Sequence, residues 1–472
     1  MERTPGVYIQ EIGLLPSSVA PISTAIPAFI GYTDKGGGTG RPLDGQAVRI
    51  NSLLEYEKMY GKAENQRLVI TVDTATNTPI KVAVDTTDPS PYLMYYQVLM
   101  YFLNGGGPCY IISVNRYQDT GTKVQSKYLD DSVIDSSTGR VGGLALARKV
   151  DEITLLVFPD APALEDKDYY NLYQAALKQC SELQNRFTLI DVKDPVSPDT
   201  SASPIAAFRG TTTFPGIGIN YLNYGAAYYP YLNTTLSYQY DLASSLSFVD
   251  RNKDTITDTG SLSANTKFIA SLERLIAGFP VTLPPSGAIA GIYAQIDRTR
   301  GVFKAPANVS LNSVISPVRK ITDEEQQELN IHSTGKSVNA IRAFAGKGIL
   351  VWGGRTLEGN SKEWRYISVR RFFLFVEESL RKAIEPFVFE GNNENTWIRI
   401  RGLIENFLTS QWRAGALFGS TPSQAFFVNI GLGATMSAQD VLEGRLIAEI
   451  GMAAVRPAEF IILKFTHRVQ NA

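Results

Sequence analysis

Residues 153–192 carry a strand, a helix and a second strand in close succession. The apolar runs Ile153–Phe158 and Phe187–Val192 have the length and composition of buried strands. Between them, apolar side chains recur with helical spacing at Tyr169, Leu172, Tyr173, Ala176, Leu177, Cys180 and Leu183. Because a crossover helix joins strands that run in the same direction, the two strands are predicted to pair in parallel. The pattern therefore indicates an α/β fold.

The α/β pattern extends upstream to about Tyr92 and is interrupted by polar stretches. Residues 92–103 are predicted to be helical, and Cys109–Val114 reads as a further buried strand. The polar stretches are residues 66–90, 115–145 and 232–265. Such polar, turn-rich segments are typical of surface insertions. We expect the first to be a hairpin and the third to be a loop that can be removed without loss of the core.

The last third of the chain is predicted to be mainly helical. Apolar residues at helical spacing form a stripe at Val369, Phe372, Phe373, Val376, Leu380, Ala383, Ile384 and Phe387. Asn360 and Glu363 have the spacing of a capping box at the start of this helix, and Pro386 ends it. A second helix is predicted over residues 396–413, with one face formed by Ile400, Leu403, Ile404, Phe407 and Leu408. Packing within a structural domain explains both apolar stripes, so neither stripe indicates a cofactor site.

Both ends of the chain contain strand-like runs that lie outside these domains. The N-terminal run contains Val7, Tyr8, Ile9 and Ile12, and the C-terminal run contains Phe460, Ile461, Ile462, Leu463 and Phe465. Alternation places apolar residues on both faces of the C-terminal run, which predicts burial on two sides. A free apolar strand invites pairing through its backbone. We therefore predict that both runs are arms that add strands to neighbouring subunits.

Charge and cysteine content exclude several classes of function. A net charge of −1 over 472 residues gives no general attraction to nucleic acid or to an anionic membrane. Residues 12–33 lack charge but contain three prolines, so they cannot form a membrane-spanning helix. Cys109 and Cys180 lie in apolar stretches and are expected to be free, buried thiols. Residues 336–472 hold 17 Lys and Arg against 12 Asp and Glu, which predicts an acidic partner for this part of the chain.

Two stretches with the outline of a ligand site lack essential positions. The sequence TGKS at 334–337 is similar to the end of a phosphate-binding loop, but the position that requires glycine is Asn330. Residues 250–258 carry side-chain oxygens at the spacing of a calcium loop, but Thr255 and Ser261 replace the required glycine and glutamate. No cofactor or metal site is predicted from either stretch.

Several longer stretches carry a resemblance to one family. They are TPGVYIQEI (4–12), IPAFIGYT (26–33), YFLNGGGPCYIISV (101–114), PPSGAIAGIYAQIDRTRGVFKAPAN (284–308), GKGILVWGGRTLEGNSKEWRYISVRRFFLFVEESL (346–380), ENTWIRIRGLIENFLTSQWRAGALFG (394–419) and RPAEFIILKF (456–465). In this order they resemble the tail sheath proteins of contractile phages and of related contractile injection systems.

This resemblance implies a fold and an order of domains. Residues 1–25 would form an N-terminal β-arm. Residues 26–345 would form the α/β sheath body, with a subtilisin-like topology and the three insertions. Residues 346–458 would form an α+β C-terminal sheath domain, and residues 459–472 a C-terminal β-arm.

The resemblance also implies a structural function without turnover. Sheath subunits of the family polymerise as a helical stack of rings around an inner tube, with six subunits to a ring. The sheath then contracts and drives the tube through a target cell envelope. The implied partners are further copies of the chain, paralogous sheath proteins, the inner tube, and baseplate and tail terminator proteins, without nucleic acid or membrane insertion.

The resemblance implies assembly in the bacterial cytoplasm into a phage tail or a phage-tail-like particle. Membrane-anchored devices belong to the same group, and the insertions favour a particle released outside the cell. No catalytic residue, cofactor or metal is implied.

A subtilisin-like hydrolase, active or inactive, is the alternative interpretation. Its triad would need a histidine base near a serine nucleophile. The only histidines are His332, in a polar loop, and His467, in the C-terminal run. Ser286 follows two prolines and is predicted to cap a helix beginning at Gly287. These residues form no convincing triad, so the chain is not expected to be an enzyme.

Overall fold

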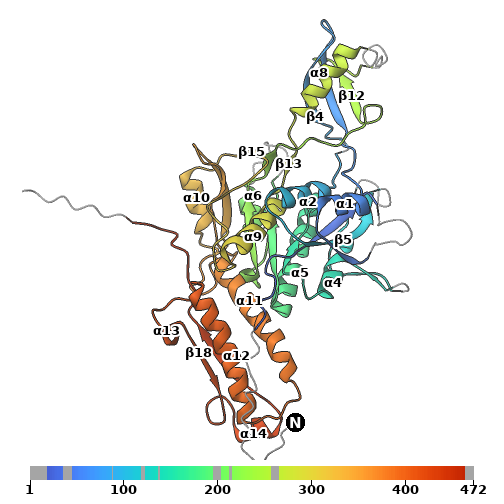
Figure 1. Cartoon of the computed structure of the whole chain (residues 1–472). Helices are drawn as coiled ribbons and strands as arrows, with labels where there is room; N and C mark the ends of the chain where they lie inside the picture. The colour runs from blue at the N-terminus through green and yellow to red at the C-terminus, as the bar shows by residue number, and fades with distance from the viewer. Residues whose placement is uncertain are drawn as a thin grey trace, which may run out of the picture. The chain divides into compact units, whose positions relative to one another are not determined.

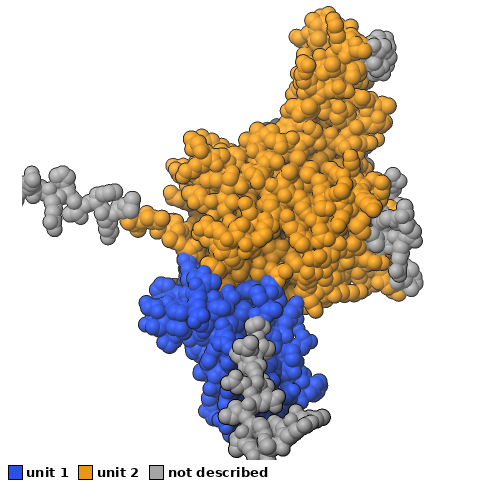
Figure 2. All heavy atoms as spheres, viewed as in Figure 1, with its two compact units in different colours: residues 1–22, 375–456 blue, residues 23–374, 457–472 orange. Residues whose placement is uncertain are grey.

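The computed structural model describes residues 19–35, 45–87, 89–117, 123–136, 139–194, 203–211, 215–256 and 265–462. The chain divides into two compact units (Figure 2). Unit 1 comprises residues 1–22 and 375–456, and unit 2 comprises residues 23–374 and 457–472. The predicted arm residues outside the described part of the chain are Val7, Tyr8, Ile9, Ile12, Leu463 and Phe465.

Unit 2 is built around a nine-stranded sheet with the order β14-β17-β16-β10-β9-β8-β1-β5-β2. The six central strands are parallel: β16 (Val338–Phe344), β10 (Gly225–Tyr229), β9 (Phe187–Asp191), β8 (Leu155–Val157), β1 (Pro27–Thr33) and β5 (Cys109–Arg116). Antiparallel strands flank them: β2 (Ala47–Ile50), β17 (Gly348–Val351) and β14 (Val309–Ser310). The predicted parallel pair is confirmed, since Leu155 lies opposite Phe187.

Helices of unit 2 surround this sheet (Figure 1). They are α1 (Leu53–Tyr60), α2 (Met94–Leu103), α3 (Ser126–Leu129), α4 (Gly143–Arg148), α5 (Asp166–Leu183), α6 (Pro204–Arg209), α9 (Ser286–Arg300) and α10 (Asp323–Asn330). The helix α5 carries the predicted apolar stripe. Seven of its eight buried residues are aromatic, aliphatic or Cys180, and the eighth is Gln179. Short 3₁₀ turns cover Ala161–Ala163, Leu222–Tyr224 and Glu385–Phe387.

The start of α9 differs from the prediction that Ser286 caps it. Ser286 is the first helical residue, and its hydroxyl makes no capping hydrogen bond. The exposed backbone donors are satisfied from other elements instead. Asp191 Oδ1 accepts from Ser286 N at 2.8 Å, and Gln97 Oε1 accepts from Gly287 N at 2.7 Å. The helix therefore begins where tertiary contacts satisfy its first N–H groups.

The insertions at 66–90 and 232–265 form one subdomain with its own core. The predicted hairpin is confirmed as β3 (Leu68–Asp73) and β4 (Thr78–Val84), and β12 (Leu246–Val249) pairs with β3 in parallel. The helix α8 (Thr266–Ala277) lies beside these strands (Figure 1). The apolar cluster between them comprises Leu68, Ile70, Val72, Val82, Phe268, Leu272 and Ile276.

The prediction that residues 232–265 are a polar loop is therefore wrong, whereas their removal without loss of the core stays a prediction. Residues 232–234 form β11, which pairs with β13 (Thr282–Leu283) and β15 (Val314–Pro317) in a small second sheet. Residues 246–249 form β12 of the subdomain sheet. Local polarity concealed these strands because each is short, with three residues in β11 and four in β12.

The 115–145 stretch is also more than a surface insertion. It contains α3, the short hairpin β6 (Val133–Asp135) and β7 (Arg140–Val141), and the start of α4. Leu129 and Leu144 from this stretch are fully buried in the main core of unit 2. The segment therefore forms part of the core of unit 2, although it was predicted to be a surface insertion.

Unit 1 combines helices with a two-stranded sheet. Its elements are the second part of α11 (Ile367–Ile384), then α12 (Glu394–Arg413), α13 (Pro422–Ala425), β18 (Phe426–Ile430), α14 (Ala438–Leu442) and β19 (Ala448–Met452). Both predicted helices are confirmed. The predicted capping box is wrong, because α11 begins at Ile367 and Asn360 donates instead to the carbonyl of His332.

Candidate functional site at the root of the C-terminal arm

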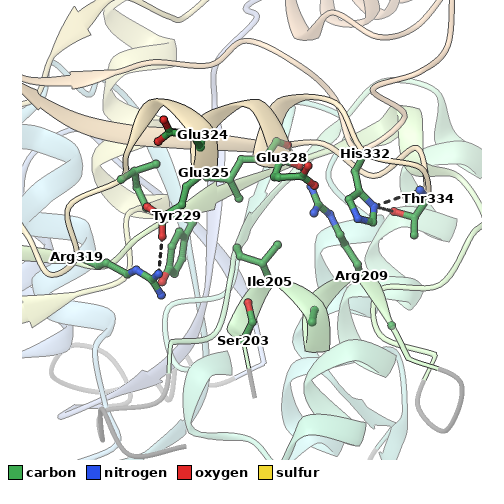
Figure 3. Close-up of a pocket in the computed structure, with 14 residues that line it drawn as sticks. Ser203, Ile205, Arg209, Tyr229, Arg319, Glu324, Glu325, Glu328, His332 and Thr334 are labelled. Carbon is green, nitrogen blue, oxygen red and sulfur yellow. Dashed lines mark hydrogen bonds and ion pairs between the residues drawn. The ribbon is translucent and has the colours of Figure 1, made fainter. Parts of the chain in front are cut away.

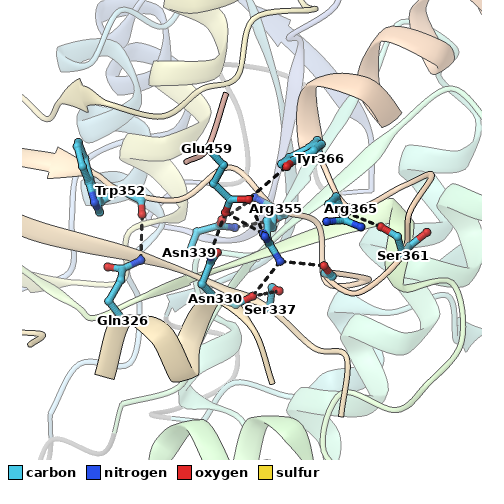
Figure 4. Close-up of polar contacts among 11 residues, drawn as sticks. Gln326, Asn330, Ser337, Asn339, Trp352, Arg355, Ser361, Arg365, Tyr366 and Glu459 are labelled. Carbon is cyan, nitrogen blue, oxygen red and sulfur yellow. Dashed lines mark hydrogen bonds and ion pairs between the residues drawn. The ribbon is translucent and has the colours of Figure 1, made fainter. Parts of the chain in front are cut away.

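The C-terminal arm leaves the body of unit 2 at a carboxylate held by three side chains. Arg355 donates to both oxygens of Glu459, from Nε to Oε1 at 2.9 Å and from Nη2 to Oε2 at 2.6 Å. Asn330 Nδ2 donates to Oε1 at 2.8 Å, and Tyr366 OH donates to Oε2 at 3.2 Å. Figure 4 shows these groups converging on Glu459. We call Glu459 with Arg355, Asn330 and Tyr366 the Glu459 anchor.

The guanidinium of Arg355 is fixed from several directions. The backbone of Arg355 is clamped by Asn339 of β16, which accepts from its N–H and donates to its carbonyl, both at 2.8 Å. Arg355 Nη1 donates to the carbonyl of Gly359 at 3.0 Å. Asn339 also donates to the carbonyl of Ala227 on β10. The anchor is thereby tied to the central sheet, and the side chain of Arg355 is only 3% exposed.

Electrostatics keep the Glu459 carboxylate charged. Partial burial raises its pKa, but hydrogen bonds from Arg355 and Asn330 and the positive charge of Arg355 lower it by more, so the net pKa lies below its ordinary value. Burial and the negative charge of Glu459 raise the pKa of Tyr366, which therefore remains a hydrogen-bond donor. A bidentate arginine–carboxylate pair fixes orientation as well as distance. The anchor therefore fixes both the position of Glu459 and the direction in which the chain leaves it.

The residues immediately after the anchor have the opposite character. Phe460, Ile461 and Ile462 are 67%, 80% and 79% exposed, and they form no strand with other described residues. Glu459, which is held by several hydrogen bonds, is thus followed directly by three consecutive apolar side chains that are exposed to solvent. The remaining predicted residues of the arm, Leu463 and Phe465, lie outside the described residues. Strand donation by the arm stays a prediction.

A two-stranded sheet in unit 1 is suited to accept a strand. Each of β18 and β19 has only the other as a strand neighbour in the sheet that the structure describes. Phe427 lies opposite Gly451, and a Cβ at Gly451 would overlap the Phe427 ring, so the ring covers the glycine. Phe427 is nevertheless 49% exposed. Two-stranded sheets are marginal alone and gain stability from an added strand.

The candidate hydrolase residues do not come together. Ser286 is fully buried at the start of α9, whereas His332 follows α10 and its Nδ1 lies 2.9 Å from Thr334 Oγ1. His467 lies outside the described residues. Asp191 faces Ser286, but through the Ser286 backbone N–H. This geometry supplies Ser286 with no imidazole base from His332.

A pocket of about 460 Å³ beside α10 is lined by two arginines that already have partners within the chain (Figure 3). Arg319 Nη2 donates to Glu325 Oε1 at 2.5 Å. Arg209 Nε donates to the carbonyl of Lys336 at 3.1 Å, and its Nη2 donates to that of Glu328 at 2.5 Å. Arg209 therefore satisfies carbonyls near the end of α10, as cations commonly do at helix C-termini.

Among the described residues, no three His, Cys, Asp or Glu side chains are grouped so that they could hold a metal ion. No described helix is both long and apolar enough to cross a bilayer.

Comparison with known proteins identifies the family. Residues 219–357 match the central domain of phage tail sheath proteins, and residues 360–468 match their C-terminal domain. The chain is 30% identical to a subunit in the PVC sheath complex, an extracellular contractile injection system in its contracted state. That likeness covers 100% of this chain and 99% of the other, with a TM-score of 0.63. The chain belongs to the phage tail sheath protein family.

Other family members give the same result. The helical sheath of the anti-feeding prophage in its contracted state is 31% identical, with 99% of each chain covered and a TM-score of 0.63. The tail sheath protein of Vibrio phage KVP40 is 25% identical over 137 residues, which are 29% of this chain and 20% of that protein. The chain thus spans about a fifth of that curated relative. These relatives are structural sheath proteins, which favours the sheath over the hydrolase interpretation.

Proposed function

We propose that this chain is a structural subunit of a contractile sheath. Copies polymerise helically around an inner tube, and contraction of the polymer drives the tube through a cell envelope. The observation that carries the proposal is the likeness over the whole chain to sheath subunits solved in the contracted state. The α/β body fits this function without a catalytic site, since rearrangement of contacts within the polymer supplies the work.

The Glu459 anchor explains how a subunit transmits force to its neighbour. Phe460, Ile461 and Ile462 add, with the rest of the arm, to the β18–β19 sheet of another copy, which covers their apolar side chains and pairs their backbone groups. Val7, Tyr8, Ile9 and Ile12 form the companion arm. Arg355 holds the root of the C-terminal arm, so the arm bends beyond Glu459 while the body turns as a rigid object.

Finer features of the assembly rest on the family resemblance. They are six subunits to a ring, an inner tube inside the polymer, and baseplate and terminator proteins at its ends, with paralogous sheath proteins as further partners. A subtilisin-like topology of the body and assembly in the bacterial cytoplasm belong to the same set. The relatives with known structures include an extracellular injection system, which supports an extracellular particle.

Truncation at the anchor tests the proposal. Deletion of residues 460–472 keeps Glu459 and its partners, so the subunit should remain soluble and unfold cooperatively. It should form no tubules or rings in negative-stain micrographs, whereas the full chain forms both. A matched control that replaces Phe460, Ile461 and Ile462 with other β-branched or aromatic residues should retain assembly. Tubules of normal length from the truncated chain would refute arm-dependent polymerisation.

A further inference from the structure

Unit 1 contains a groove of about 540 Å³ formed by the end of α11 and the first half of α12. Ala383, Phe387 and Leu403 give it apolar walls. The charged residues of its lining are Lys382, Arg399 and Glu390, and Lys382 is paired with Glu378 at 3.4 Å. The Arg399 guanidinium lies over the Phe387 ring at 5.0 Å from the centroid, which fixes that side of the groove. The groove therefore suits an apolar segment.

The N-terminal chain reaches unit 1 at this groove. Val19, the first described residue, is only 9% exposed, and residues 20–22 line the groove. The N–H of Ile22 donates to Ser379 Oγ on α11 at 3.4 Å. Residues 1–18 are thus attached directly at the edge of an apolar groove.

We propose that residues 13–16 of the same subunit, Gly-Leu-Leu-Pro, occupy this groove before the subunit polymerises. Leu15 is four residues from Val19, so it can lie at most about 14 Å away at roughly 3.4 Å per residue. Leu14 and Leu15 match the apolar walls of the groove. A short tether gives an effective concentration on the order of millimolar, which favours the subunit's own segment over that of another copy.

This inference rests on the proposed function and adds a regulatory contact to it. With residues 13–16 in the groove, the adjacent run Val7–Ile12 is held against its own unit. That run cannot then extend fully to a neighbouring sheet. Release from the groove is therefore coupled to strand donation, and the free subunit is protected from premature association.

Disulfide trapping of the dilute subunit tests the proposal. Cys109 and Cys180 are buried, and burial raises the pKa of both thiols, so introduced cysteines should react selectively. The test variant combines L15C with A383C in the groove. The matched control combines L15C with S423C, an exposed residue of α13 that does not line the groove. A mixture of the L15C and A383C single variants reports linkage between copies.

The groove proposal predicts an intramolecular disulfide in most of the L15C/A383C monomers, at least fivefold more than in L15C/S423C. Equal linkage in both variants, or linkage only between the mixed single variants, would overturn it. Unchanged thermal unfolding of reduced L15C/A383C verifies that the groove remains intact. Tubule formation by the unmodified chain is measured in a separate experiment. If tubules form but no disulfide is trapped, only the groove contact is refuted. If the disulfide is trapped but no tubules form, the result counts only against the sheath function.

Discussion

Arg355 binds both carboxylate oxygens of Glu459, and these two residues are separated by 104 positions in the chain. Arg355 is tied through Asn339 to the central sheet, whereas Glu459 immediately precedes three exposed apolar residues. The pair thus joins the central sheet of unit 2 to the start of its C-terminal arm.

Removal of the Glu459 carboxylate should destabilise unit 2 and weaken assembly. E459A leaves the Arg355 charge buried and unpaired, at a cost of about 3 kcal/mol. E449A, on exposed β19, is the matched control and should change the unfolding free energy by less than about 0.5 kcal/mol. Urea titration measures both. Because the pKa of Glu459 is lowered, its stabilisation is present above the unfolded pKa near about 4.3 and is lost as the pH falls below it.

The double variant R355A/E459A provides a further check. If the two side chains act as a pair, the double variant should lose less stability than the sum of R355A and E459A. Additive losses would show that each residue acts through separate contacts.

Asp191 should make the stability of unit 2 fall as the pH rises. Burial raises its pKa to about 7, although hydrogen bonds from Ser286 lower it. The pKa of Asp191 in the folded chain thus exceeds its value of about 3.9 in the unfolded chain, so protonation of the carboxyl favours the folded state. This contribution is present below the unfolded pKa and is lost as the pH rises through about 7. D191N retains an oxygen for Ser286 N–H and should flatten the slope of unfolding free energy between pH 5 and 8 by at most about 1.4 kcal/mol per pH unit.

Chemical denaturation of D191N and the unmodified chain at several pH values measures this slope. Asp160 is a second buried carboxyl with a pKa raised to about 7 by burial, so D191N should retain part of the pH dependence. An unchanged slope in D191N would exclude Asp191 as a contributor.

The subdomain of β3, β4, β12 and α8 should lose stability without loss of the body. L272A removes a fully buried side chain from its separate core and should cost about 2–5 kcal/mol there. E273A, at the next and exposed position of α8, is the matched control. Hydrogen exchange should accelerate in β3 and α8 but not in β9. Faster exchange throughout unit 2 would mean that the subdomain and the body unfold together.

The contact between Phe427 and Gly451 should be sensitive to one methyl group. G451A places a Cβ into the Phe427 ring and should destabilise the β18–β19 sheet, because the ring must move. F427A removes the ring, so G451A should lower the stability of the F427A variant by less than it lowers the stability of the unmodified chain. Circular dichroism melts of the four variants measure this coupling. Equal costs in both backgrounds would show that the ring is not the obstacle.

The elements that follow from sequence alone are those with a strong local period. The helix α5 and the parallel strands β8 and β9 are such elements, because their apolar spacing reflects burial within one continuous segment. The helix α12 is also predicted within two residues of its observed start. Features that depend on distant residues are not visible in the same way. Ser286 is an example, since Asp191 and Gln97 satisfy the start of α9.

Net charge was a poor guide to the surface. The basic excess in residues 336–472 predicted an acidic partner, but Lys336, Arg355, Arg370 and Arg371 are at least 95% buried. Arg371, for instance, donates to both oxygens of Asp297. These four charges serve internal contacts rather than a partner surface, and an acidic partner for this part of the chain stays a prediction.

The candidate site was only half visible in the sequence. The apolar run from Phe460 marks the arm, and Glu459 is the only charge between Pro457 and Leu463. This lone carboxylate before the apolar run is the feature of the sequence that distinguishes Glu459. Its partners Arg355, Asn330 and Tyr366 carry no such signal, because their role arises only when β16, β17 and α10 come together.

Disulfide trapping inside assembled tubules tests the central claim most directly. I462C in the arm is combined in turn with F427C, N429C or E449C on the exposed face of β18 and β19, and tubules are oxidised and run on a non-reducing gel. Donation of the arm predicts a ladder of covalent oligomers for at least one pair in tubules, and none in the dilute subunit. Intact tubules that give no ladder with any of the three pairs would contradict strand exchange through the β18–β19 sheet.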